Sequence, residues 1–436
     1  MAVSFARAAA FDILLRVERD AAFATELLHS KKIDELSTAD RGLVTEIVLG
    51  VLRWQSALDA AIAVQASQPL RKLDREVLIA LRIGAYQLRF LDRIPANAAV
   101  NESVNLVKRA RKRSAVPFAN AVLRNLSKER MPCDKSSLAA EYAHPEWIVS
   151  RWLAAYGATA TEAICRHDQQ IPETSIRLPF DAARREIVAR ELQQAGITLE
   201  PGRLVNVARR VVSGDVRTTQ AFARGEVWIQ DEASQLVALL AGKGERILDC
   251  CAAPGGKTSV LAERNPSAKV VALELHEQRA QLLRDRVRAA NVEVQTADVT
   301  AMTSTTGFDC VLADVPCSGT GTLARNPEIK WRLRLEDLAD FQRRQVAILR
   351  AALAQLAPGG RLVYSTCSLE PEECETVVEQ VLAEGIEVLD CTTELQKLGS
   401  EIVFNDVDAL VLGRYLRTLP GVHPGDGFFA AVLSRR

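Results

Sequence analysis

The sequence predicts a multidomain protein with an all-helical front domain, a small α+β segment, and an α/β domain built on a doubly wound, mostly parallel sheet. Three observations predict this class. The chain has 436 residues, which is long for a single domain. Residues 1–135 carry apolar stripes at helical spacing without strand signals. From about residue 245, short apolar runs alternate with helical stretches. We therefore expect domains at 1–135, 144–235 and 236–436.

Apolar stripes predict the helices of the front domain. Ser37 followed by Asp40 predicts the cap of one of these helices. Pro95 and Pro117 mark the starts of two further helices, and Pro132 with the polar residues after it predicts a linker. The two clearest stripes consist of Leu43, Ile47, Val51 and Trp54, and of Leu78, Leu81, Ala85 and Leu88.

The order of these helices, with the segments TADRGLVTEIVLGVLRW and IPANAAVNESVNLVKR, resembles the NusB-type RNA-binding helical domain. The resemblance covers the front third of the chain and implies an RNA-binding role for it. The segment 144–235 is less informative: helix, glycine turn and strand signals predict a small α+β unit without a catalytic constellation. Its tryptophans Trp147, Trp152 and Trp228 are expected to pack in a core rather than to stack on bases.

The formal net charge of zero conceals an uneven distribution. Residues 1–135 carry 22 Lys or Arg and 15 Asp or Glu, a net of +7, whereas residues 136–436 carry 33 and 40, a net of −7. Five basic side chains gather within six positions of the basic part. This run favours a surface for RNA or DNA phosphates over an ordinary solvated helix face. Its members are Lys108, Arg109, Arg111, Lys112 and Arg113.

The composition is otherwise that of an ordinary globular protein, with 48% hydrophobic and 25% charged residues, which excludes a disordered chain, a collagen-like fibre and a long coiled coil. No run of about 18 apolar residues predicts a transmembrane helix, and early acidic residues argue against a targeting peptide. Nine cysteines without a C-x-x-C pair predict reduced thiols in a cytoplasmic protein without a metal site. We expect a monomer.

In the last domain, five strands are predicted, and ligands of such a sheet bind at the carboxyl ends of its strands. A glycine turn follows the first strand, but position 251 is Cys rather than the Gly that a phosphate-binding loop requires. The turn comprises Cys251, Ala252, Ala253, Pro254, Gly255, Gly256 and Lys257. The predicted strands are Arg246–Cys250, Lys269–Leu273, Val292–Gln295, Phe308–Ala313 and Arg361–Tyr364.

Acidic residues close the next three strands. Glu274 lies where a carboxylate accepts hydrogen bonds from both ribose hydroxyls, and Asp298 is placed to accept from an adenine amino group. Together with Asp314 and a turn without phosphate specificity, they favour an adenosine ligand that lacks a pyrophosphate. S-adenosylmethionine is such a ligand. Cys317 and Cys367 follow the fourth and fifth strands, whereas the other cysteines fit buried packing roles.

The segments LDCCAAPGGKT, ADVPCSGTG, NPEIKW, YSTCSLEPEE and HPGDGFFAAVL resemble the RNA cytosine-C5 methyltransferases over residues 145–436. With the NusB-like front domain, the resemblance extends along the whole chain to the members of this family that act on 16S ribosomal RNA. It implies a Rossmann-like class I methyltransferase fold, S-adenosylmethionine as cofactor, and cytosine 967 as the target. The chain departs from the family in having Val315 in place of Ala and Glu274 in place of Asp.

The resemblance also implies roles for site residues. Cys367 is the nucleophile that adds to C6 of cytosine, because C5 is too weakly nucleophilic unaided. Asp314 assists at N3, and Cys317 releases the product. Lys257 is expected near Asp314 or the cofactor.

Three other interpretations stay open. A DNA cytosine-C5 methyltransferase would use Cys317 as its nucleophile and be indifferent to Cys367. An enzyme of the same family acting on transfer RNA is the closer alternative. A non-catalytic RNA-binding antitermination factor is the third.

Overall fold

The computed structural model describes residues 3–128, 134–303, 307–382 and 385–436, so that the start of the expected linker at Pro132 lies outside the described residues. Contacts divide the chain into two compact units. Unit 1 is Met1–Ile171 with Leu323–Leu333, and unit 2 is Pro172–Thr322 with Arg334–Arg436. The first unit thus takes in a short segment that the sequence places in the last domain. The domain limits expected at 135, 144 and 235 stay predictions.

Unit 1 is helical throughout its described residues, as the apolar stripes predict. No single helix among the described residues has the length and hydropathy to cross a membrane, although α4 and α5 pass that test when taken together across a 78° bend. The helices are α1 (Phe5–Asp20), α2 (Ala24–Leu28), α3 (Lys31–Asp34), α4 (Thr38–Arg53), α5 (Gln55–Gln65), α6 (Arg75–Phe90), α7 (Ala96–Arg109), α8 (Val116–Leu126), α9 (Leu138–Glu141), α10 (Glu146–Asp168) and α16 (Ile329–Arg332).

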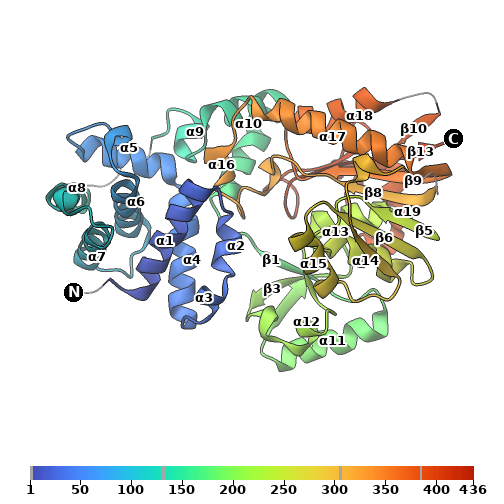
Figure 1. Ribbon diagram of the computed structural model, residues 1–436, viewed down its shortest axis with the longest axis horizontal. Helices are drawn as coiled ribbons and strands as arrows, with labels where there is room; N and C mark the ends of the chain where they lie inside the picture. Colours follow the sequence, from blue (N-terminus) through green and yellow to red (C-terminus); the bar gives the residue numbers. More distant parts are fainter. Residues whose placement is uncertain (1–2, 129–133, 304–306, 383–384) are drawn as a thin grey trace. The chain divides into compact units, whose positions relative to one another are not determined.

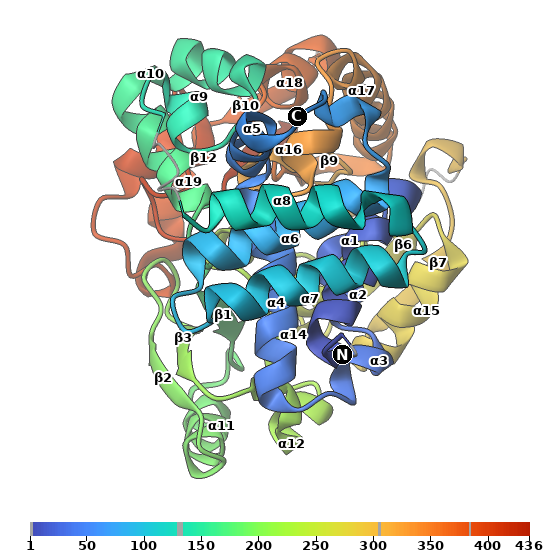
Figure 2. The same cartoon turned by 90° about the vertical axis from the view of Figure 1, so that its left-hand side faces the viewer.

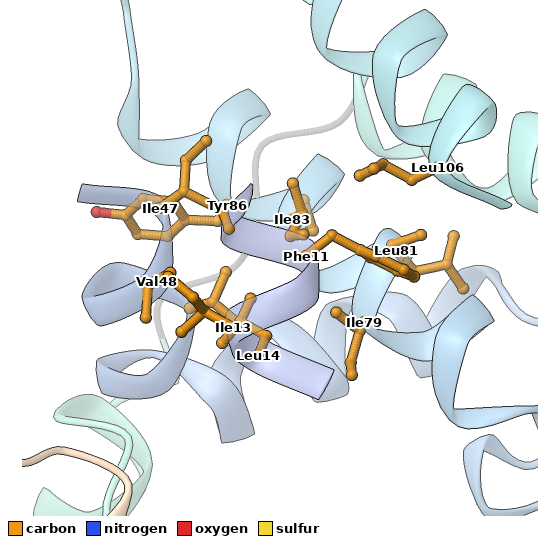
Figure 3. Close-up of a cluster of buried hydrophobic side chains, with 14 of the residues drawn as sticks. Phe11, Ile13, Leu14, Ile47, Val48, Ile79, Leu81, Ile83, Tyr86 and Leu106 are labelled. Atoms are coloured by element: carbon orange, nitrogen blue, oxygen red, sulfur yellow. The ribbon is translucent and has the colours of Figure 1, made fainter. Parts of the chain in front are cut away.

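Helix α6 is the centre of unit 1. It packs against α1, α4, α5, α7 and α8, and Figure 2 shows α6, α7 and α8 running side by side. Its residues 79–87 are all buried, because neighbours cover this helix on every side. Figure 3 shows the cluster in which Tyr86 and Ile83 of α6 meet Ile47 of α4 and Phe11 of α1.

The sequence signals for individual helices in unit 1 are confirmed. Ser37 caps α4, since its hydroxyl accepts a hydrogen bond from the Asp40 amide at 3.1 Å. Along α4, Ile47 and Val51 are fully buried. Helix α7 begins directly after Pro95, and Pro117 lies in the first turn of α8.

Unit 2 contains the predicted doubly wound sheet. Its order is β11-β12-β13-β9-β8-β5-β6-β7, with β10 paired to β13. The five strands β9, β8, β5, β6 and β7 run parallel, and the remaining strands are antiparallel. The strands are β5 (Arg246–Asp249), β6 (Lys269–Glu274), β7 (Val292–Thr296), β8 (Phe308–Asp314), β9 (Leu356–Thr366), β10 (Ile386–Leu389), β11 (Val411–Leu412), β12 (Tyr415–Thr418) and β13 (Phe428–Arg435).

Alternating side chains place helices on both faces of this sheet. Ile247, Leu312 and Val363 pack in one core with residues of α13, α14 and α19, whereas Leu248 and Val311 pack in another core with residues of α17 and α18. Figure 1 shows these helices beside the sheet. The central strands β5, β6 and β8 are buried on both sides, which explains their continuous apolar runs. The helices are α13 (Glu232–Leu240), α14 (Gly256–Arg264), α15 (Glu277–Arg286), α17 (Asp337–Ala354), α18 (Glu375–Val381) and α19 (Cys391–Leu398).

A second, antiparallel sheet of order β2-β3-β1-β4 precedes the large sheet in the chain. Its strands and the helices α11 and α12 form their own small core, which includes Ile176, Val188 and Val216. The predicted sequence of helix, glycine turn and strand is confirmed here, with Gly196 at φ +80° between α11 and β2. The elements are β1 (Thr174–Arg177), α11 (Ala182–Gln194), β2 (Thr198–Pro201), β3 (Ala208–Ser213), α12 (Gln220–Ala223) and β4 (Trp228–Ile229).

Candidate active site

The order of the parallel strands locates the site. From β5 the chain adds β6 and β7 on one side and then β8 and β9 on the other, so the connections change direction between β5 and β8. In open α/β sheets, ligands bind at the carboxyl ends of the strands at such a switch point. Asp249 ends β5 and Asp314 ends β8, which brings the predicted glycine turn and the predicted Asp314 together at this point.

The turn after β5 has room only for glycine at its tightest residue. Gly255 has φ +108°, and a Cβ on it would lie 2.6 Å from Cγ2 of Val287. The Ala252 amide donates to the carbonyl of Leu273 on β6 at 2.8 Å, which holds the start of the turn against the neighbouring strand. Helix α14 begins at Gly256. Its first amides therefore lie at the switch point, where a helix N-terminus attracts a negatively charged group.

Asp249 lies beneath this turn. It is buried, and one of its oxygens, Oδ2, accepts a hydrogen bond from the Thr258 hydroxyl at 2.7 Å. The other oxygen, Oδ1, has no hydrogen-bond partner within the described part of the chain. Loss of solvation raises the pKa of Asp249 to about 7.

The three acids predicted for the cofactor lie at or just after the ends of three of the parallel strands. Glu274 ends β6, is buried, and accepts a hydrogen bond from the His276 amide at 3.0 Å. Asp298 follows β7 and is exposed, and its side chain accepts from the Thr300 amide at 2.8 Å. Asp314 ends β8. The unpartnered Oδ1 of Asp249, the glycine turn and these acids suit a cationic, hydroxyl-bearing adenosine ligand such as S-adenosylmethionine.

Asp314 has a cationic partner that the sequence suggested only weakly. Lys257 Nζ lies 2.8 Å from Asp314 Oδ2, and the Ser365 hydroxyl donates to Oδ1 at 2.7 Å. The Lys257 ammonium also lies over the ring of Phe428, 5.0 Å from its centroid. The closing segment HPGDGFF thus contributes a wall to the site.

The two predicted catalytic cysteines meet. Cys317 lies in the loop after β8 and Cys367 in the loop after β9, and their Sγ atoms are 3.3 Å apart. Both side chains are half-buried. The hydrogen bond with Cys367, followed by loss of solvation, raises the pKa of Cys317 well above its ordinary value. Either sulfur can donate in this contact, and the 3.3 Å separation is the distance of an S–H···S hydrogen bond between the two thiols.

A backbone connection holds the two cysteine loops in register. The Gly321 amide donates to the Cys367 carbonyl at 2.9 Å, and the Gly427 amide donates to the Gly321 carbonyl at 2.8 Å. A Cβ on Gly321 would lie 2.3 Å from the Gly427 carbonyl oxygen, so only glycine fits between these two segments.

The remaining described cysteines have the expected packing character. Burial raises the pKa of Cys374 and of Cys310 to about 12. Cys133 lies outside the described residues. Among the described residues, no three metal-ligating side chains cluster, and the expected lack of a metal stays a prediction. The described free cysteines are Cys165, Cys250, Cys251, Cys310, Cys317, Cys367, Cys374 and Cys391.

The five basic side chains of residues 108–113 differ in whether an acidic neighbour pairs with them. Arg109 makes a two-pronged ion pair with Asp12, at 2.9 and 2.8 Å, and Lys112 lies 3.2 Å from Asp74. Lys108, Arg111 and Arg113 are exposed and make no ion pair with the described residues. Two of the five predicted RNA contacts therefore carry charges that are already compensated within the protein.

Some residues at the site had no assignment from sequence. Asp249 was visible only as the acid that ends a strand. Ser365 pairs with Asp314, and Glu373 lies behind both cysteine loops. Glu373 is one of several acids in SLEPEECE, and its spacing does not distinguish it from its neighbours.

This fold and this site define a Rossmann-like methyltransferase joined to a NusB-like helical domain. A family model described as 16S rRNA methyltransferase RsmB/F matches residues 236–434, a NusB family model matches residues 4–128, and a model of the ferredoxin-like domain of RsmF/B-like methyltransferases matches residues 144–214.

Similar proteins agree along nearly the whole chain. A probable ribosomal RNA small subunit methyltransferase B of Bacillus subtilis is 34% identical, with 98% of both chains covered. A ribosomal RNA small subunit methyltransferase B of Vibrio cholerae is 33% identical, with 92% of this chain and 91% of that protein covered. The crystal structure of a methyltransferase homolog protein from Pyrococcus horikoshii is 26% identical over 69% of this chain and 98% of that one, with a TM-score of 0.56. The chain belongs to the ribosomal RNA small subunit methyltransferase B family.

Proposed function

We propose that this protein transfers a methyl group from S-adenosylmethionine to C5 of a cytosine in 16S ribosomal RNA, through a covalent adduct between Cys367 and C6. The observation that carries this proposal is the pair of thiols 3.3 Å apart in the two loops that follow β8 and β9. Cytosine 967 is the target that the family resemblance implies. A cytosolic location belongs to the same proposal.

The cofactor would be held by the turn from Cys251 to Lys257 and by the acids Glu274, Asp298 and Asp314. When bound, it supplies an electrophilic methyl group on a sulfonium. The unpartnered oxygen of Asp249 adds negative charge close to the turn when that carboxyl is ionised. Negative side chains around a cationic ligand stabilise it by simple electrostatics.

Cys367 is proposed to start the reaction as a thiolate. Its sulfur forms a bond to C6, and the electron pair of the C5–C6 double bond moves into the ring, which makes C5 nucleophilic. A free thiol with a pKa of about 8.5 is mostly protonated at neutral pH, so the thiolate needs stabilisation. The thiol of Cys317, whose sulfur lies 3.3 Å away, is proposed to supply it by donating its S–H to the Cys367 thiolate.

Asp314 is proposed to share a proton with N3 of the base. The addition of Cys367 places negative charge on the ring at N3. A proton taken up there from solvent is held in a hydrogen bond to the Asp314 carboxylate and is given back when the C6–S bond breaks. Lys257 and Ser365 fix the orientation of the Asp314 carboxylate, because each bonds one of its oxygens.

Cys317 is proposed to complete the reaction as a base. Its proton is held mainly by the hydrogen bond to the Cys367 sulfur, and this cause disappears once that sulfur is bonded to C6. Cys317 then loses its proton to solvent, takes the C5 proton from the methylated base, and the C6–S bond breaks. The electron pair returns to Cys367, and one proton is released for each methyl group transferred.

The ribosomal RNA substrate is supported by the names of the relatives and by the NusB-like front domain. The test is transfer of a radiolabelled methyl group to naked 16S RNA, followed by mapping of the modified base. We expect one 5-methylcytosine at the predicted position. Methylation of transfer RNA but not of 16S RNA would replace the substrate, and a lack of S-adenosylmethionine binding in calorimetry would favour a non-catalytic RNA-binding factor.

A further inference from the structure

Behind the two cysteines lies a buried carboxylate that the mechanism above does not use. Glu373 belongs to the short helical turn Pro371–Glu373 before α18, and its side chain is fully buried. No cation lies within ion-pair distance of it among the described residues. A buried charge of this kind is costly unless hydrogen bonds compensate it.

Four hydrogen-bond donors compensate the charge of Glu373. Ser318 donates its amide to Oε1 at 2.8 Å and its hydroxyl to Oε2. Ser368 donates its hydroxyl to Oε2 at 2.5 Å, and Gln345 of α17 donates its side-chain amide to Oε1 at 2.9 Å. Both carboxyl oxygens of Glu373 therefore accept hydrogen bonds, which is the arrangement that suits a carboxylate.

The identity of these donors is informative. Ser318 directly follows Cys317, and Ser368 directly follows Cys367. Gln345 also donates to the carbonyl of Pro316, the residue before Cys317, at 3.0 Å. One carboxylate therefore fixes both cysteine loops, each at the residue adjoining its sulfur.

The buried carboxyl of Glu373 also acts on the thiol of Cys317. A negative charge near a thiol disfavours its ionisation. Glu373 contributes in this way to the raised pKa of Cys317, after the larger effects of the Cys367 hydrogen bond and of burial.

We infer that Glu373 is a positioning residue of the active site: bonded to the residue that follows each cysteine, it sets the distance between the two sulfurs and makes Cys367 the more reactive of the two. This inference rests on the proposed function, since it assigns the nucleophile to Cys367. A purely structural role predicts that the loss of Glu373 lowers the amount of folded protein without changing which thiol reacts.

The test uses the full chain with its cofactor absent and no RNA. A short pulse of iodoacetamide at pH 7, followed by peptide mass spectrometry, gives the ratio of alkylation at Cys367 to that at Cys317. In the unmodified protein we expect Cys367 to react faster. In Glu373→Gln, which keeps the shape but removes the charge, we expect this ratio to fall at least fivefold. Glu372→Gln, the same change at the half-buried neighbouring residue, serves as the control and keeps the ratio.

A second variant separates charge from geometry. Glu373→Asp keeps the charge but shortens the reach to Ser318 and Ser368, so we expect an almost unchanged alkylation ratio together with a kcat lowered at least tenfold and a KM for RNA changed less than threefold. A folded Glu373→Gln protein with the original ratio and kcat overturns the inference. If neither variant folds, Ser318→Ala and Ser368→Ala replace them, and an original kcat in both overturns it as well.

The alkylation ratio does not depend on turnover. If Cys367→Ala retains full activity, the proposed function fails, whatever the ratio is. If Cys367→Ala is inactive and the ratio does not respond to Glu373→Gln, only the role of Glu373 fails. The two failures are therefore distinguishable.

Discussion

At the scale of single residues, the two cysteines have different proposed roles although they lie in similar loops. The sulfurs of Cys317 and Cys367 lie 3.3 Å apart, and the hydrogen bond between them is the main cause of the raised pKa of Cys317. The proposed roles of the two cysteines predict different consequences when each is removed. Loss of the proposed nucleophile should prevent the covalent bond, whereas loss of the proposed base should leave that bond unbroken.

We expect Cys317→Ala to form a covalent complex with substrate RNA that persists, because the C5 proton is not removed. A denaturing gel of protein incubated with RNA and S-adenosylmethionine measures this as a band of reduced mobility. Cys367→Ala should give neither the band nor methyl transfer. A shifted band in Cys367→Ala, or its absence in Cys317→Ala, would contradict the assignment.

Asp249 gives a pH-dependent prediction. Its pKa rises from 3.8 to about 7 on folding, so between these pH values only the folded state holds the proton. The free energy of unfolding then falls as pH rises, by roughly 4 kcal/mol in all at about 1.4 kcal/mol per pH unit. Asp249→Asn removes this loss. We expect it to raise Tm more at pH 8 than at pH 5.

Calorimetric melting of the cofactor-free protein at both pH values measures the effect of Asp249→Asn. The same change at the exposed Asp285 controls for the loss of one negative charge. A difference in Tm that is equal at pH 5 and pH 8 would show that Asp249 is not protonated in the folded protein.

At the scale of secondary-structure elements, α4 illustrates how packing reverses a helix propensity. Glycine in a helix interior costs about 1 kcal/mol relative to alanine. Gly50 nevertheless lies on the buried side of α4, in its last turn, where a Cβ would come within 1.9 Å of Cζ in the Tyr86 ring. The hydroxyl of Tyr86 donates to Glu46 of the same helix at 2.6 Å, so the ring has no free direction in which to move.

We expect Gly50→Ala to lower the free energy of unfolding by about 1–3 kcal/mol, the cost of overpacking a core. Gly42→Ala in the same helix is the matched control, because nothing lies within 4 Å of its added Cβ. This control should raise stability by up to about 1 kcal/mol. Urea unfolding measures both, and a stabilising Gly50→Ala would contradict the packing described here.

At the scale of the whole molecule, the chain passes between the two units three times. The segment Leu323–Leu333, which contains α16, begins six positions after Cys317 yet belongs to unit 1. Within unit 1, Trp331 donates its indole N–H to the Leu52 carbonyl at 2.6 Å. The buried Lys330 donates to the carbonyls of Arg53 and Ala143, at 2.9 and 3.1 Å.

We expect a fragment of residues 1–171 to be less stable than the same residues in the full chain, because these carbonyls lose their partners. A synthetic peptide of residues 323–333 should raise its Tm in a concentration-dependent way, as any ligand of the folded state does. A peptide with Trp331→Ala and Lys330→Ala should raise Tm less. An unchanged Tm at peptide concentrations far above that of the fragment would contradict this role.

The proposed RNA-binding surface of unit 1 also gives a prediction at the scale of the whole molecule. We expect the charge reversals Lys108→Glu, Arg111→Glu and Arg113→Glu to lower the salt dependence of RNA affinity by about one in log–log slope for each phosphate that the protein no longer neutralises. Arg109→Gln should change the slope less than Arg111→Gln does, because Asp12 already neutralises Arg109. Filter binding over a range of salt concentrations measures both, and an unchanged slope after the three reversals would reject this surface.

The sequence by itself determined the features that depend on neighbouring residues. Apolar spacing predicted α4 and α6, the alternation of strands and helices predicted the parallel sheet, and two cysteine motifs marked the loops after β8 and β9. The net charge of zero likewise concealed a basic front third. These features can be predicted from the sequence because the periodicity of helices and strands and the residue preferences of turns depend on only a few neighbouring positions.

Only the tertiary structure decided which of these groups meet. Lys257 lies 57 positions from Asp314, and Glu373 lies 55 positions from Ser318, so no spacing rule pairs them. Arg109 likewise pairs with Asp12, which lies 97 positions earlier in the chain. Side-chain partners across such separations are set by how helices and strands pack, and packing is a property of the whole core.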